Sequence, residues 1–195
     1  MSIAFFENQF RSQVAAGDFA LNPFEEAALP RLSGRVLDYG CGLGNLALAA
    51  ARRGCRVVAL DASDTAIRRI REAAAGEGLP VEAEAADLRS YVPAGEFDAV
   101  VSIGLLMFFD CPTARARLAE LQARVCPGGI AVINVLVEGT TFLAMFDGDN
   151  RCLFARDELR RSFAGWEILG EDYREFPAPG ETIKRFVTLT ARKKD

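Results

Sequence analysis

A glycine-rich run preceded by an aspartate is the segment of this sequence most suited to binding a charged ligand. The run reads Val36-Leu37-Asp38-Tyr39-Gly40-Cys41-Gly42-Leu43-Gly44-Asn45, and its spacing is G-x-G-x-G. Glycines let the backbone approach a ligand in conformations that a Cβ would forbid. A dinucleotide fingerprint would need a glycine at position 45, where this sequence has Asn45. The carboxylate of Asp38 would also repel a pyrophosphate. The run therefore favours a ligand that carries an ammonium group.

Two further aspartates follow later apolar runs of the same kind. Asp61 ends the run that begins at Val57, and a carboxylate at this position can accept hydrogen bonds from a ribose diol. Asp87 follows a third run and occupies a position that commonly faces an adenine amino group. Together with Asp38, these residues predict a nucleoside-type site at one edge of a sheet.

The composition excludes much other chemistry. The 195 residues include no histidine, so no Ser-His-Asp or Cys-His nucleophile system and no His-ligated zinc or haem is present. The net charge of −4 disfavours nucleic acid as a partner. The five cysteines are odd in number and form no C-x-x-C pair, which indicates neither a metal site nor a disulfide framework. We expect Cys41, Cys55, Cys111, Cys126 and Cys152 to be small apolar residues of a reducing cytosol, with a thiol that touches substrate as the alternative.

Membrane and export signals are absent from the pattern. Charged residues interrupt every apolar stretch before it is long enough to span a bilayer, and no basic region precedes an apolar run at the N-terminus. The sequence therefore predicts a cytoplasmic protein with no membrane contact.

Strands and helices alternate from residue 34 onward. The expected strands are Arg35–Tyr39, Arg56–Leu60, Pro80–Ala85, Phe97–Ser102 and Ile130–Val137, and the expected helices are Asn45–Arg53, Ser63–Ala75, Thr113–Val125 and Ala155–Phe163. Apolar strands interleaved with amphipathic helices predict a parallel sheet covered on both faces. The strands Glu167–Asp172 and Ile183–Arg192, joined by a Pro/Gly-rich loop, must pair antiparallel. The fold class is α/β: a Rossmann-like three-layer sandwich with a mostly parallel seven-stranded sheet and an antiparallel last strand.

Residues 1–33 are expected to be helical and to form a cap or lid on a domain of residues 34–195, within a single compact domain. Asn22 as N-cap, Pro23 at the first position and Glu25 as capping-box partner predict a helix start. The first helix carries Phe5, Phe6, Phe10 and Phe19, more aromatic surface than a lone helix should expose. Two interpretations stay open: a lid over the ligand, or docking against the sheet edge.

The chain resembles class I S-adenosylmethionine-dependent methyltransferases. Its run from Asp38 to Gly44, its acidic Asp61, its Ala86-Asp87-Leu88, its Phe97–Ser102 strand and its Cys126-Pro127-Gly128-Gly129 are similar to successive motifs of that family. The resemblance implies S-adenosylmethionine as cofactor and S-adenosylhomocysteine as its product. The implied cofactor contacts are Asp38, Gly40, Cys41, Gly42, Asn45, Asp61, Ala62, Ala86, Asp87, Leu88, Ser102 and Ile103.

Further stretches are similar to the tellurite-resistance methyltransferases, which methylate soft oxyanions. These stretches are Leu105–Asp110, Phe154–Glu167 and Arg185–Lys194. That family carries a His-Arg pair in the loop before its last strand, and Tyr173-Arg174 occupies this place here. The resemblance implies that Arg174 positions an anionic acceptor by charge-assisted hydrogen bonds, with Tyr173 assisting. Met107, Phe108 and Arg174 are expected to line the acceptor pocket.

Three functions stay open at this stage. A methyltransferase for a soft anion such as tellurite or selenite needs no base, because the nucleophile is already deprotonated. A methyltransferase for an amine, a thiol or a carboxylate is the second, and a non-catalytic S-adenosylmethionine-binding protein is the third. The expected partner is a small molecule, and the expected assembly is a monomer or a homodimer.

Overall fold

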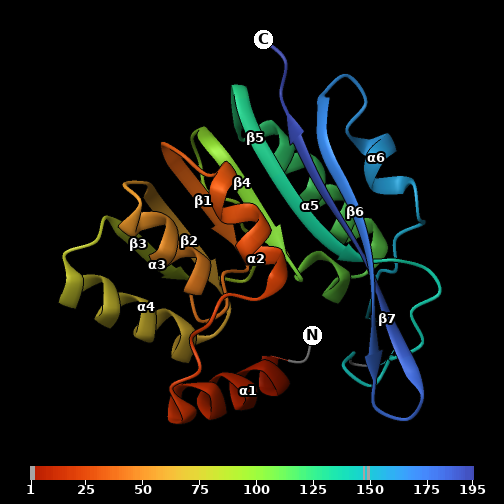
Figure 1. Cartoon of the computed structure of the whole chain (residues 1–195), viewed down its shortest axis with the longest axis horizontal. Coiled ribbons are helices and arrows are strands. Elements are labelled where there is room, and N and C mark those ends of the chain that lie inside the picture. Colours follow the sequence, from red (N-terminus) through yellow and green to blue (C-terminus); the bar gives the residue numbers. More distant parts are fainter. Residues whose placement is uncertain (1–2, 147, 149) are drawn as a thin grey trace.

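A seven-stranded sheet organises the chain, and helices cover both of its faces (Figure 1). The structure is a computed structural model that describes residues 3–146, 148 and 150–195, with side chains from Phe6 onward, so the side chain of Phe5 lies outside the described set. The strands are β1 (Arg35–Tyr39), β2 (Arg56–Asp61), β3 (Val81–Ala85), β4 (Phe97–Ile103), β5 (Val125–Leu136), β6 (Glu167–Ala178) and β7 (Thr182–Arg192).

Strand order reverses once in the middle of this sheet. The order is β3-β2-β1-β4-β5-β7-β6, in which β3 to β5 are parallel and β7 is antiparallel to both of its neighbours. The chain moves outward from β1 in one direction and later returns to β4 on the other side of β1. Such a switch point opens a crevice beyond the carboxyl ends of the strands, where ligands of open α/β sheets bind.

Two apolar cores, one on each face, hold the layers together. The helices are α1 (Ile3–Ala16), α2 (Pro23–Ala28), α3 (Asn45–Arg52), α4 (Asp64–Glu77), α5 (Cys111–Ala123) and α6 (Glu158–Ser162), with 3-10 turns η1 (Leu29–Arg31) and η2 (Leu106–Phe108). Val36 of β1 packs in the core under α2 to α4, and the next residue, Leu37, packs in the core under α5 and α6. Successive side chains along a strand point to opposite faces of the sheet. A sheet covered on both faces therefore needs apolar residues at consecutive positions of its strands. The predicted fold class is confirmed.

The C-terminal hairpin is longer than its sequence pattern suggests. The loop expected after Asp172 is wrong, because β6 continues to Ala178 and its residues pair in register with β7. Pro177 fits in β6 because β6 lies at the sheet edge, where one row of backbone groups needs no partner. Tyr173 and Arg174 therefore lie within a strand and not in a loop.

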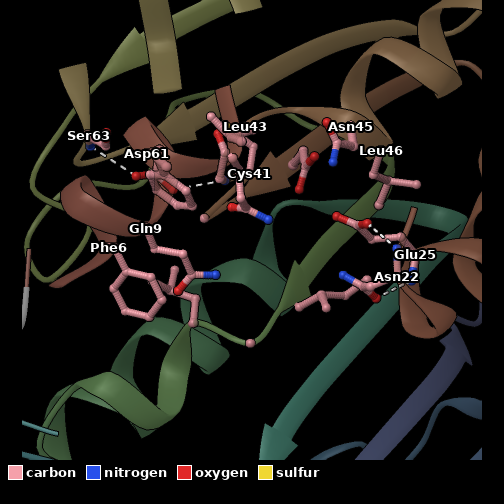
Figure 2. A pocket seen from close by; sticks show the side chains of 18 of the residues that line it. Phe6, Gln9, Asn22, Glu25, Cys41, Leu43, Asn45, Leu46, Asp61 and Ser63 are labelled. Atoms are coloured by element: carbon pink, nitrogen blue, oxygen red, sulfur yellow. Dashed lines mark hydrogen bonds between the residues drawn. The ribbon is translucent and has the colours of Figure 1, made fainter. Parts of the chain in front are cut away.

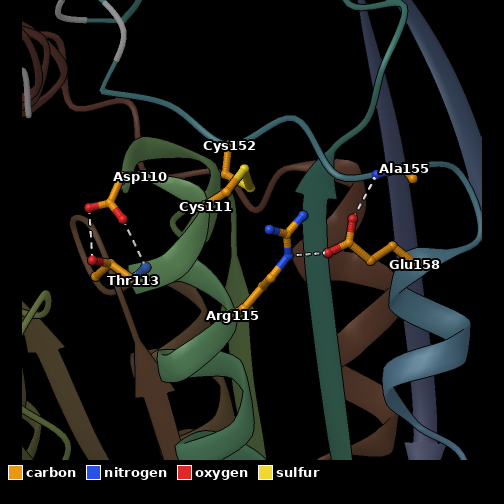
Figure 3. The surroundings of a disulfide bond; sticks show 7 residues. All are labelled: Asp110, Cys111, Thr113, Arg115, Cys152, Ala155 and Glu158. Carbon is orange, nitrogen blue, oxygen red and sulfur yellow. Dashed lines mark hydrogen bonds and ion pairs between the residues drawn. A yellow bond between two sulfur atoms is a disulfide. The ribbon is translucent and has the colours of Figure 1, made fainter.

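A disulfide joins Cys111 and Cys152, so the expectation of five reduced cysteines is wrong for this pair (Figure 3). Cys111 opens α5 directly after the N-cap residue Asp110, and the N–H of Cys152 donates to the carbonyl of Met107. This backbone contact brings together two thiols that are 41 residues apart in sequence. Such a long-range contact leaves no spacing pattern, which is why the sequence did not indicate it.

Reduction of this bond is expected to lower the free energy of unfolding by about 2–4 kcal/mol, because the disulfide closes a long loop in the unfolded chain. Chemical denaturation with and without a dithiol reductant measures this difference. Cys152→Ser should remove the response to reductant, and Cys126→Ser, which changes a free cysteine, should keep it. Equal stability of the oxidised and reduced wild type would contradict the pairing.

No helix in the described part of the chain is long and apolar enough to cross a bilayer.

Candidate active site

A cavity of about 280 Å³ lies beyond the carboxyl ends of β1, β2 and β4, at the switch point of the sheet (Figure 2). Strand ends form its floor, and α1 and α2 form its outer wall. The lining residues are Phe6, Gln9, Phe10, Gln13, Ala20, Asn22, Glu25, Asp38, Gly40, Cys41, Gly42, Leu43, Asn45, Leu46, Asp61, Ala62, Ser63, Leu88, Ile103, Gly104, Leu105 and Phe108.

The loop between β1 and α3 can hold its shape only with glycines. Gly40 and Gly44 have φ angles of 84° and 72°, in the left-handed region that glycine tolerates best. A Cβ at Gly44 would lie 2.4 Å from Cγ1 of Ile70, and a Cβ at Gly40 would lie 2.8 Å from Cβ of Leu105. The loop is therefore packed against its neighbours and brings its backbone to the cavity surface.

Asp61 at the end of β2 fixes this loop in place. Its Oδ2 accepts a hydrogen bond of 2.9 Å from the N–H of Gly42, and its Oδ1 accepts one of 2.9 Å from the N–H of Ser63. Burial raises the pKa of Asp61, and these backbone hydrogen bonds oppose the rise. Each carboxylate oxygen keeps a second lone pair, so Asp61 can also accept hydrogen bonds from hydroxyl groups of a ligand.

Asp38 at the end of β1 has the most perturbed environment in the cavity. Asp38 is 5% exposed, and within the described residues no donor forms a hydrogen bond to its carboxylate. Burial raises the pKa of Asp38 to about 8, and the nearby carboxylates of Glu25 and Asp61 add to the rise. A buried carboxylate without a partner is costly. The cavity is therefore suited to a ligand that places a cationic group beside Asp38.

Helix α1 packs along one side of the cavity. Glu7 accepts hydrogen bonds from the hydroxyls of Ser63 and Thr65, which attach α1 to the start of α4. The ring of Phe6 meets that of Phe108 edge to face, with 4.9 Å between centroids. Helix α1 thus covers part of the cavity surface. The assignment of residues 1–33 as a cap and its motion as a lid stay predictions.

Most of the predicted cofactor contacts lie together at this cavity. Asp38, Gly40, Cys41, Gly42, Asn45, Asp61, Ala62, Leu88 and Ile103 line it, and Ala86, Asp87 and Ser102 do not. The carboxylate of Asp87 instead forms an ion pair of 2.7 Å with Arg89, and Ser102 is fully buried in β4. Their roles as cofactor contacts stay predictions.

The predicted acceptor residues are divided between places. Phe108 lines the cavity, whereas Met107 is buried beside it in a cluster with Leu136 and Met145. Tyr173 and Arg174 are neighbours on β6, so their side chains point to opposite faces of the sheet.

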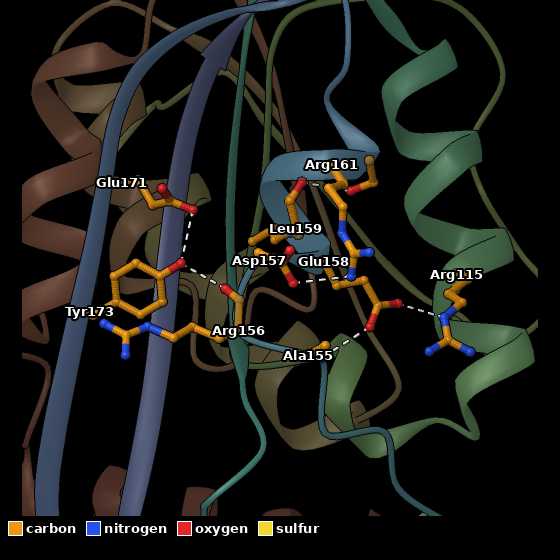
Figure 4. Close-up of polar contacts among 10 residues, drawn as sticks. Arg115, Ala155, Arg156, Asp157, Glu158, Leu159, Arg161, Glu171 and Tyr173 are labelled. Atoms are coloured by element: carbon orange, nitrogen blue, oxygen red, sulfur yellow. Dashed lines mark hydrogen bonds and ion pairs between the residues drawn. The ribbon is translucent and has the colours of Figure 1, made fainter.

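Neither Tyr173 nor Arg174 lines the cavity. The Tyr173 hydroxyl lies 2.6 Å from the carbonyl oxygen of Arg156, on the α6 side (Figure 4). The guanidinium of Arg174 lies on the α2 side, where its Nε donates to Asp172 at 2.6 Å. The two residues cannot act on one acceptor atom in this arrangement, and their catalytic assignment stays a prediction.

Arg174→Ala tests whether Arg174 binds the acceptor, as the resemblance implies, or has no part in binding, as its position outside the cavity indicates. If Arg174 binds the acceptor, its removal should raise the acceptor KM. Because Arg174 is exposed, paired with Asp172 and outside the cavity, we expect kcat/KM and the cofactor Kd to stay within about twofold of wild type. Steady-state kinetics and calorimetry measure both, and a KM rise of tenfold or more at unchanged cofactor Kd would restore the assignment. Arg185→Ala, another exposed paired arginine, is the control.

Comparisons of sequence identify a domain and distant relatives. Residues 36–129 match a family described as a methyltransferase domain. Hemagglutinin 1 of Eikenella corrodens is 32% identical over 173 residues, which cover 82% of this chain and 54% of that protein. A probable S-adenosyl-L-methionine-dependent methyltransferase TehB of Haemophilus influenzae is 26% identical over 172 residues, which cover 82% and 57%. The chain thus spans about half the length of these curated relatives.

Solved structures share the fold. The crystal structure of TehB from Haemophilus influenzae superposes with a TM-score of 0.80 at 21% identity and covers 93% of this chain and 65% of that one. The N-methyltransferase NodS of Bradyrhizobium japonicum, crystallised with S-adenosylhomocysteine, gives a TM-score of 0.72 at 19% identity and covers 97% and 99%. At these identities the likeness concerns the fold alone.

Proposed function

We propose that this chain, which contains a class I S-adenosylmethionine-dependent methyltransferase domain related to TehB, transfers methyl groups from S-adenosylmethionine to a small acceptor. The buried carboxylate of Asp38, without a hydrogen-bond donor in the described residues and facing the cavity at the switch point, is the observation that carries this proposal. It fits a cofactor with an ammonium group and a sulfonium centre, and it fits a pyrophosphate poorly.

Different residues of the cavity would bind different parts of the cofactor. Asp38 would hold its cationic group and Asp61 its ribose hydroxyls, while Leu88 and Ile103 supply apolar surface. The backbone of the glycine loop lies at the cavity surface at Gly40 and Gly42, and a Cβ at Gly40 would lie 2.8 Å from Cβ of Leu105. When bound, S-adenosylmethionine supplies an electrophilic methyl group on sulfur.

The chain's own contribution to the reaction is positioning and exclusion of water. Approximation of donor and acceptor can supply several kcal/mol of the barrier reduction. The rings of Phe6 and Phe108 and the side chain of Leu105 line the cavity, and this apolar surface would exclude water from the reacting atoms. We propose that residues 1–33 serve as the cap of a methyltransferase domain formed by residues 34–195, and that the protein acts on a small molecule in the cytoplasm.

A soft oxyanion such as tellurite or selenite is the acceptor that the family resemblance favours. The relationship to TehB supports this choice. The charge of the cavity opposes it, because no lysine or arginine is found among the lining residues that the structure describes. An amine, a thiol or a carboxylate acceptor, and a binding role without catalysis, are the alternatives.

Formation of S-adenosylhomocysteine tests the proposed function. The purified chain is incubated with S-adenosylmethionine and tellurite, selenite, small amines or thiols, and the product is measured by chromatography, with headspace detection of dimethyl telluride or selenide. We expect acceptor-dependent S-adenosylhomocysteine. Cofactor binding without turnover on any acceptor class would favour the binding role, and no cofactor binding would overturn the proposal.

A further inference from the structure

We propose that the methyl acceptor is an amine on a small apolar body, and that Glu25 is the residue that binds and selects it. This inference rests on the proposed methyl transfer and names its substrate class. Glu25 lies on α2 at the cavity wall, and Figure 2 shows it away from Asp61 and Ser63, the residues at the end of β2.

The charge of the cavity favours a cation. Glu25, Asp38 and Asp61 all line it, and the described lining offers no lysine or arginine to balance them. Asp38 and Asp61 are the carboxylates suited to the cofactor, because they lie at the carboxyl ends of β1 and β2, at the switch point. Glu25 is the third carboxylate; it lies on α2 and not at a strand end, and we assign it to the acceptor. An anionic acceptor would find no positively charged side chain in the described lining, and a cationic acceptor would find a carboxylate.

The local structure holds Glu25 by one oxygen and leaves the other available. Its Oε2 accepts a hydrogen bond of 2.8 Å from the N–H of Asn22, and the Asn22 side chain accepts from the N–H groups of Phe24 and Glu25. This capping box fixes the carboxylate at the start of α2. Within the described residues Oε1 has neither a hydrogen-bond donor nor a basic partner. Burial raises the pKa of Glu25, as expected for a carboxylate without a countercharge.

Aromatic side chains supply the apolar part of the site. Phe6, Phe10 and Phe108 line the cavity, with ring centroids 6.0 Å apart for Phe6 and Phe10 and 4.9 Å apart for Phe6 and Phe108. Such rings bind apolar groups and also favour a nearby cation through the negative face of the ring. In Figure 2 Phe6 lies on the Asp61 side of the cavity and Glu25 on the other side, so an amine whose extended aryl or alkyl body spans the cavity would reach both the rings and the carboxylate.

The same carboxylate can take the proton that the bound ammonium must lose before it can react. Oε1 of Glu25 accepts this proton and leaves a neutral amine with a lone pair. As that lone pair forms the new N–C bond, the C–S bond breaks and leaves its electron pair on sulfur. The methylated amine leaves as an ammonium ion that keeps its remaining protons, and Glu25 returns its proton to solvent. No histidine is present for this task, and a carboxylate with a raised pKa is a competent acceptor.

Binding of matched amines and carboxylates tests the proposal. The probes are phenethylamine and hexylamine against 3-phenylpropionate and heptanoate, which have similar shapes and opposite charge. Calorimetry on the wild-type chain loaded with S-adenosylhomocysteine should show the amines binding at least tenfold more tightly than the carboxylates. Equal or tighter binding of the carboxylates or of tellurite would overturn the proposal on the wild type alone.

Glu25→Gln tests the residue itself. Glutamine can keep the hydrogen bond from Asn22 in a capping box but loses the charge. We expect the variant to bind S-adenosylhomocysteine within about threefold of wild type and to lose the preference for amines, with a lower kcat for amine methylation. Glu26→Gln removes the same charge from the exposed neighbouring residue on α2. This variant should keep both the preference for amines and the kcat of the wild type. A persisting amine preference in Glu25→Gln would refute the role of Glu25. Failure of the chain to bind S-adenosylhomocysteine at all would instead contradict the methyltransferase function.

Discussion

Asp38→Asn is expected to weaken binding of S-adenosylmethionine by roughly 30-fold or more, because removal of one partner from a buried charge pair costs about 2–5 kcal/mol. The same substitution should stabilise the ligand-free protein at pH 8. The reason is that Asp38 is buried beside Glu25 and Asp61 with no donor from the described residues, so its charge is unfavourable until a cation binds. Calorimetry gives the affinity, and urea denaturation gives the stability.

A neutral substitution at an exposed aspartate serves as the control. Asp18 is exposed and lies outside the cavity lining, so Asp18→Asn should change neither property. An Asp38→Asn variant that binds the cofactor as tightly as wild type would exclude Asp38 from the cationic subsite.

Binding of S-adenosylmethionine to the wild type should weaken about tenfold per pH unit between pH 7.5 and pH 6, or roughly 30-fold over the window. Burial, Glu25 and Asp61 raise the pKa of Asp38 to about 8, so the carboxyl is mostly protonated in this range. A cation can pair with it only when the proton leaves, and each binding event should therefore release close to one proton. Calorimetry in buffers of different ionisation enthalpy counts that proton.

The stability of the ligand-free protein should show the linked effect. The folded-state pKa of Asp38 lies above its ordinary value, so protonation favours the folded state, and this contribution is lost as the pH rises from about 4 to about 8. Asp38→Asn should flatten this part of the stability profile and also remove the proton release on binding. An unchanged proton release in the variant would assign the titration to another group.

The sheet could be predicted because its strands carry their own signals. The bounds expected for β1, Arg35–Tyr39, agree with the structure, since a buried parallel strand is a short apolar run between a turn and a glycine loop. The end of β6 could not be predicted, because Pro177 suggested a loop. Only pairing with β7 at the sheet edge shows that this proline belongs to a strand.

The cavity residues at the strand ends could be predicted from the sequence, whereas those on α1 and α2 could not. Carboxyl ends of neighbouring parallel strands meet at one edge, so Asp38 and Asp61 could be placed together from their positions in sequence. Glu25 gave a correct capping-box signal but no indication that α2 would bring it to the cavity wall. The contributions of Gln9 and Gln13 depend on how α1 packs against the start of α4, and this contact has no local sequence pattern.

Tyr173 and Arg174 were expected in a loop, because the resemblance places them where that family carries its His-Arg pair. Adjacent side chains can converge in a loop. In the extended strand they point to opposite faces, and the guanidinium pairs with Asp172. The disulfide between Cys111 and Cys152 was missed because the contact that forms it is tertiary.

Calorimetric titration of the purified chain with S-adenosylmethionine at pH 7.5, with S-adenosylhomocysteine as competitor, tests whether the cavity at the switch point binds this cofactor. We expect binding of one cofactor per chain, competition by S-adenosylhomocysteine, and a large loss of affinity in a folded Asp38→Asn variant. Absence of heat and of any thermal shift with both ligands, in a wild-type chain shown to be folded, would contradict this expectation.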